Sequence, residues 1–141
     1  QLMQGIFFRL SNAVFLAHSE DPATIPADPR PSTSPNPLTG VIGGWEGVAN
    51  RPLGLADAAD LLMTPGRTCA NGEPVPLDRA DWATLVEGLR VASMKAYEAA
   101  RARNKDRIVE VSGEPAESCA NCHRVYRERW QQGRPTCLSP P

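Results

Sequence analysis

Residues 78–104 read DRADWATLVEGLRVASMKAYEAARARN, and this stretch has the clearest helical pattern in the chain. Asp78 is the expected N-cap, and Asp81 falls in the first turn, where a carboxylate favours the positive end of the helix dipole. The helix should stop near Asn104, because asparagine tolerates the left-handed conformation of a helix end. Its apolar side chains recur at steps of three and four residues and therefore share one face: Trp82, Leu85, Leu89, Ala92, Ala96 and Ala99.

Three further segments have helical patterns, at residues 2–18, 54–63 and 105–131. Pro65-Gly66 should end the second of them. Gly113 and Pro115 should kink or split the last, because proline lacks a helical N–H and clashes with the preceding turn. Residues 19–44 are crowded with prolines and show no helical or strand periodicity. The chain therefore predicts an all-α fold, a four-helix bundle with a long proline-rich crossover loop between helices 1 and 2.

The composition is that of one ordinary globular domain. The 141 residues are 41% hydrophobic and 22% charged, and we treat residues 1–141 as a single domain with a tail at 132–141. The formal net charge of −1 gives no basic patch for nucleic acid. No apolar run approaches the roughly 18 residues that a membrane span needs. Because the chain opens directly on a helical segment, we expect a targeting segment to have been removed before Gln1.

Residues 119–123 read CANCH, which is the C-x-x-C-H attachment signature of a c-type haem. On a helix, residues three apart share a face, so the thiols of Cys119 and Cys122 can both reach the vinyl groups along one side of a porphyrin. His123 then offers its imidazole to the iron as the proximal ligand. The motif predicts one covalent haem c.

Three other interpretations of the motif compete with haem. A thioredoxin-like C-x-x-C belongs in a βαβ context, and the chain shows no strand pattern. A zinc site could combine Cys119, Cys122 and His123 with Cys69 or Cys137, but it would lack the second closely spaced pair usual in such sites. A chance occurrence is the third.

The placement of the motif resembles the cytochrome c′ family, in which C-x-x-C-H lies on the last helix near the C-terminus. Here Val125, Tyr126 and Arg127 follow it at once, and residues 81–129 and 61–67 share the resemblance. The proline-rich insert, Pro115 and the C-terminal tail depart from the family pattern. The resemblance implies a haem between the first and last helices. It also implies that Arg127 lies beside the proximal histidine; a solvated surface arginine is the alternative.

The sixth iron ligand decides between two functions. The first and last helices should run antiparallel, which brings the first turns of helix 1 to the level of His123. Met3 lies there and resembles the position that supplies methionine in six-coordinate members; a core or frayed Met3, with Phe7 or Phe8 facing the iron, would leave an open site. His18 lies about 22 Å further along the helix axis, at ~1.5 Å per residue, which is too far.

With His123 and Met3 as ligands, the expected function is a one-electron carrier between redox proteins. The alternative is a five-coordinate haem protein that binds NO or CO. We expect no enzyme, since no acid–base constellation surrounds the motif. Haem attachment implies a periplasmic or extracellular protein.

Two cysteines are left over in that oxidising setting. Cys69 and Cys137 are expected to form a disulfide, with unpaired thiols or interchain bridges as alternatives. We also expect a homo-oligomer, a dimer or an open filament, with the proline-rich loop and the tail at its interface.

Overall fold

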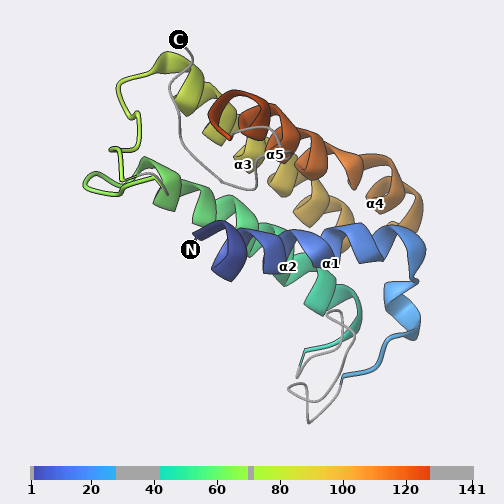
Figure 1. The fold of residues 1–141 in the computed structure, drawn as a ribbon. Coiled ribbons are helices and arrows are strands. Elements are labelled where there is room, and N and C mark those ends of the chain that lie inside the picture. Colours follow the sequence, from blue (N-terminus) through green and yellow to red (C-terminus); the bar gives the residue numbers. More distant parts are fainter. Residues whose placement is uncertain (1, 28–41, 70–71, 128–141) are drawn as a thin grey trace.

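The computed structural model describes residues 2–27, 42–69 and 72–127. Within them the chain is all-α, and the predicted four-helix bundle is confirmed (Figure 1). The first three helices and the fourth, which is split in two, run alternately up and down the bundle (Figure 1). The elements are η1 (Met3–Phe7), α1 (Phe8–Ser19), η2 (Pro22–Thr24), α2 (Gly44–Ala58), η4 (Ala59–Met63), α3 (Ala80–Arg101), α4 (Lys105–Val111) and α5 (Gly113–Tyr126).

The bundle is held mainly by three neighbouring pairs of helices. α2 packs along α3 most extensively, α1 packs on α2, and α5 packs on α3. The pair formed by α1 and α5 touches much less, although the two helices run antiparallel as expected (Figure 1). The start of the chain therefore lies at the same end of the bundle as the end of α5.

The second helix is ten residues longer at its start than the prediction of 54–63. α2 begins at Gly44, whose φ of 59° is a left-handed conformation that suits glycine and turns the chain into the helix. Pro52 lies inside α2. A proline removes one helical hydrogen bond, and its burial among the apolar residues of α2 offsets that loss. The predicted loop 19–44 is correspondingly shorter; residues 28–41 lie outside the described part.

The third helix begins at Ala80 rather than after an Asp78 cap. The backbone of Arg79 is extended at the N-cap position, and Asp81 lies in the first turn as expected. At the other end the helix stops at Arg101, near Asn104 as predicted, but Asn104 is not the residue with the left-handed backbone. Arg103 adopts the left-handed conformation, with φ of 52°, while the Asn104 side chain accepts a hydrogen bond from the Arg107 amide and caps α4.

The fourth helix is split, as Gly113 and Pro115 predicted. α4 ends at Val111 and α5 begins at Gly113, with Pro115 in the first turn of α5, where its missing N–H costs no helical hydrogen bond. α5 ends at Tyr126, earlier than the predicted residue 131, because the Arg127 backbone is extended. Residues 128–131 and the tail lie outside the described part of the chain.

The buried side chains form two clusters, one toward each end of the bundle. The first joins the C-terminal half of α1 to α2, α3 and α4, with Ile108 and Val111 fully buried. The second, called the lower cluster here, contains Phe7, Leu55, Ala58, Ala59, Leu62, Trp82, Val86, Leu89 and Tyr126. The C-x-x-C-H motif of α5 lies against this lower cluster.

Candidate functional site

The motif is carried by the last two turns of α5. Cys119 and Cys122 are three residues apart on the helix and are both half-buried. Both side chains pack against the lower cluster, together with Leu2 and Ile6 from the start of the chain. The first turns and the motif therefore share one apolar cluster at the same end of the bundle, and the two thiols lie on that apolar surface.

Burial also sets the protonation of these thiols. It raises the pKa of Cys119, and it is the main cause that raises the pKa of Cys122 to about 11, with the charges of Cys119 and Asp81 adding to it. Both thiols are thus neutral at physiological pH. Dithiol oxidoreductases need the opposite, a thiolate stabilised by a lowered pKa. The local electrostatics do not favour a redox-active C-x-x-C.

His123 lies half-buried on the same turn, and the structure places Arg127 beside it. Arg127 Nη1 is 3.3 Å from His123 Nδ1. The pKa of His123 is lowered, chiefly by burial and then by the Arg127 charge. A neutral imidazole is the form that binds metals. Because arginine can only donate, ligation through Nε2 requires the ring proton on Nδ1, and the Arg127 contact is then one of charge rather than a hydrogen bond. The position implied for Arg127 is present, while its influence on a haem ligand stays a prediction.

A polar network that the sequence did not indicate anchors the end of α5 to the start of α3. The Tyr126 ring is 4% exposed and stacks edge-on against Trp82, with 4.8 Å between centroids. Arg79 Nε lies 2.9 Å from the Tyr126 hydroxyl and 3.0 Å from Asp81 Oδ1. Trp82 Nε1 donates to the Leu62 carbonyl at 3.2 Å. Tyr126 is therefore a contact between α5 and the start of α3.

The candidates for the distal side of a haem differ in how far their side chains are buried. Phe7 is 3% exposed and belongs to the lower cluster, whereas Phe8 is 63% exposed. Met3 lies at the expected level on η1, but its side chain is 40% exposed and is not part of the lower cluster. His18 is exposed at the far end of α1, where Nδ1 lies 3.0 Å from Ser112 Oγ. The expectation that His18 is a surface residue at a helix end is confirmed.

One buried polar atom in the described part of the chain has no hydrogen-bond partner, the Nε of Arg67. Its residue follows η4 in the loop toward α3. Native proteins satisfy nearly all buried donors, so an orphaned guanidinium N–H indicates a missing acceptor. Paired neutral thiols, a neutral imidazole and an apolar wall fit a covalently bound haem. The unmatched donor belongs to a loop whose flanking residues pack against the same cluster.

The zinc interpretation gains no support. Among residues 2–27, 42–69 and 72–127, no three His, Cys, Asp or Glu side chains converge in a way that could hold a metal ion. Cys69 is 7% exposed in the loop after η4. Its expected disulfide partner, Cys137, lies outside the described residues, and the pairing stays a prediction.

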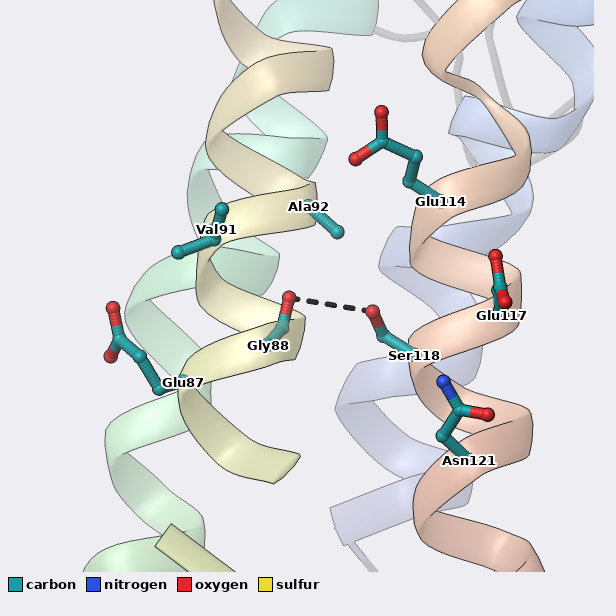
Figure 2. A pocket seen from close by; sticks show the side chains of 8 residues that line it. All are labelled: Glu87, Gly88, Val91, Ala92, Glu114, Glu117, Ser118 and Asn121. Atoms are coloured by element: carbon teal, nitrogen blue, oxygen red, sulfur yellow. Dashed lines mark hydrogen bonds between the residues drawn. The ribbon is translucent and has the colours of Figure 1, made fainter. Parts of the chain in front are cut away.

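A separate groove runs between α3 and α5 on the side of the motif helix that carries Ser118 and Asn121 (Figure 2). Ser118 Oγ donates to the Gly88 carbonyl across it at 3.3 Å. Glu87 and Glu114 on its edges pair with Arg90 and Lys95, at 3.3 Å and 2.7 Å. The cysteine pair does not line this groove, so the groove is separate from the surface that the two thiols share.

None of the helices in the described residues is long and apolar enough to cross a membrane. Comparison of the chain with protein-family models, with curated protein sequences and with solved structures finds no match. The functional assignment below therefore depends on the residues of this chain alone.

Proposed function

We propose that the chain is a monohaem c-type cytochrome that acts as a one-electron carrier in the periplasm or outside the cell. The observation that carries the proposal is the pair of neutral, half-buried thiols of Cys119 and Cys122 on one face of α5, with His123 directly after them. A bound haem supplies the Fe(III)/Fe(II) couple, and the protein buries, orients and tunes it.

Each residue of the site has a distinct role in this proposal. Cys119 and Cys122 hold the porphyrin through thioethers, and Nε2 of His123 binds the iron. Arg127 places a positive charge beside Nδ1 of that histidine, which withdraws electron density from it. Met3 is the proposed sixth ligand, because it lies on η1 at the level of the motif. Its exposure means that the side chain must turn inward for this role.

A second function is favoured by a specific observation. Phe7, not Met3, is the residue of η1 that is buried in the lower cluster beside the two cysteines. An apolar aromatic wall on the distal side would leave the iron five-coordinate and able to bind NO or CO. In that case the protein would act as a gas-binding module.

Absorption spectroscopy of the purified protein distinguishes the electron carrier from the gas-binding module. Ligation by Met3 predicts a low-spin ferric spectrum with a weak sulfur-to-iron band in the far red, which Met3→Ala abolishes. Met63→Ala, at a methionine that packs against the lower cluster, is the control and should keep that band. A high-spin ferric spectrum, together with ready binding of CO by the reduced protein, would contradict the electron carrier and support the gas-binding module.

The remaining parts of the proposal concern the whole molecule. We propose a Cys69–Cys137 disulfide, redox proteins as partners, and a homo-oligomer formed through the proline-rich loop and the C-terminal tail. Light scattering of the protein and of a variant lacking residues 21–37 tests the last point. A wild-type monomer, or an assembly unchanged by the deletion, would refute it.

A further inference from the structure

The unpartnered Nε of Arg67 lies in a firmly built loop. The Arg67 carbonyl accepts a hydrogen bond from the Val75 amide at 3.1 Å, and the Cys69 amide donates to the Glu73 carbonyl at 2.8 Å. Thr68 and Pro74 form an antiparallel bridge between these two bonds. The backbone of Arg67 is therefore fixed, and its buried Nε does not result from a frayed segment.

The chain on both sides of Arg67 is seated on the lower cluster. Leu61 and Met63 precede it and Val75 and Leu77 follow it, and all four pack against the cluster that Cys119 and Cys122 also touch. The same apolar surface thus connects the loop of Arg67 to the attachment motif. A planar group joined to both thiols would lie on the same apolar surface that supports this loop.

The chemistry of the orphaned donor specifies its acceptor. A buried guanidinium N–H is costly without a partner, and its best partner is a carboxylate, which accepts from the planar fork of donors. Other arginines near α3 already have such partners, Asp81 for Arg79 and Asp60 for Arg90. A haem carries two carboxylates of its own on its propionate side chains.

We infer that Arg67 binds a haem propionate through Nε, and that this contact positions the haem and sets part of its potential. The inference rests on the proposed haem attachment and adds a residue that the C-x-x-C-H motif does not reveal. Arg67 would neutralise the negative charge of that propionate, and with less negative charge near the iron the reduced state would be favoured. Arg67 is thus a positioning residue for the cofactor rather than an iron ligand.

The test uses the purified protein with its haem and three variants, Arg67→Gln, Arg67→Lys and Arg107→Gln. Arg107 is an exposed arginine of α4 at the opposite end of the bundle. Arg107→Gln is the control, because it removes the same charge far from the lower cluster. Arg67→Gln should shift the reduction potential to more negative values, give it a new dependence on pH in the acid range, and move the propionate bending band in resonance Raman spectra. Arg107→Gln should leave the Raman band and the pH dependence unchanged.

The outcomes separate this inference from the proposed function. The pyridine spectrum is recorded first, and a wild-type chain without covalent haem overturns both. If the haem is present and the Raman band of Arg67→Gln matches that of Arg107→Gln, the Arg67 contact alone is overturned. Should Arg67→Gln fail to fold, Arg67→Lys decides, because lysine keeps the charge but places no donor at the Nε position. A shifted band in that variant supports the contact, and an unchanged band overturns it.

Discussion

Removing the Tyr126 side chain should loosen the helix that carries the attachment motif. The ring is 4% exposed and lies 4.8 Å from the Trp82 ring at an interplanar angle of 82°. Replacing a buried aromatic residue by alanine costs about 3–5 kcal/mol, part of which is the edge-on stack, itself worth about 0.5–1.5 kcal/mol. Tyr126→Ala should therefore lower the free energy of unfolding by about 3–5 kcal/mol.

A smaller change isolates the hydroxyl. Tyr126→Phe keeps the ring and its stack and removes one hydrogen bond, so its expected cost is about 0.5–1.5 kcal/mol. Val125→Ala is the matched control on the adjacent residue, which is 38% exposed, and it should change stability by no more than about 0.5 kcal/mol.

Urea unfolding followed by far-ultraviolet circular dichroism measures all three variants, with the slopes compared to confirm that the same surface is exposed on unfolding. The expected order of destabilisation is Tyr126→Ala, then Tyr126→Phe, then Val125→Ala. A loss below about 1.5 kcal/mol for Tyr126→Ala, or an equal loss for Val125→Ala, would refute the view that Tyr126 anchors α5 on α3.

Three further predictions address the helix packing, the acid stability and the cysteines. At Gly47 a Cβ would lie 2.5 Å from a backbone carbonyl oxygen, so Gly47→Ala should destabilise the protein by about 1–3 kcal/mol. At Gly88 a Cβ would meet open space, so Gly88→Ala should stabilise it by about 0.5–1 kcal/mol. Thermal melts in which both variants shift the melting temperature in the same direction would contradict this. Hydrogen bonds with Arg79, and then with Tyr126, lower the pKa of Asp81. The contribution of Asp81 to stability is therefore present at neutral pH and is lost as the pH falls through that lowered pKa. The stability gap between wild type and Asp81→Asn should accordingly close in acid, and a gap independent of pH would disprove the linkage. Alkylation without reduction, followed by mass spectrometry, should leave Cys69 and Cys137 unlabelled, and two labelled cysteines would exclude the disulfide.

Local patterns predicted the parts of the fold that local physics determines. The helical stripe of α3 is buried at Trp82, Leu89, Ala92, Ala96 and Ala99, because a strict spacing of three and four residues leaves one face for the core. The antiparallel course of α1 and α5 followed from the count of helices alone. This antiparallel course places the start of the chain at the same end of the bundle as the C-x-x-C-H motif.

Other features depended on contacts that the sequence does not display. α2 continues through Pro52, whose burial within the bundle offsets the lost helical hydrogen bond, and no local pattern displays that burial. The link between Arg79 and Tyr126 joins residues 47 positions apart, so no periodicity could indicate it. Met3 is exposed in η1, whose π-helical geometry a period of 3.6 residues does not predict.

Covalent haem is the central claim, and extraction of the denatured protein with acidified acetone tests it most directly. The account predicts that the haem stays with the polypeptide and that the pyridine spectrum is that of a porphyrin with two thioether bonds. It also predicts that the intact mass contains one haem and that the double variant Cys119→Ser, Cys122→Ser loses it. A haem that passes into the acetone, or a wild-type mass equal to that of the polypeptide alone, would contradict the account.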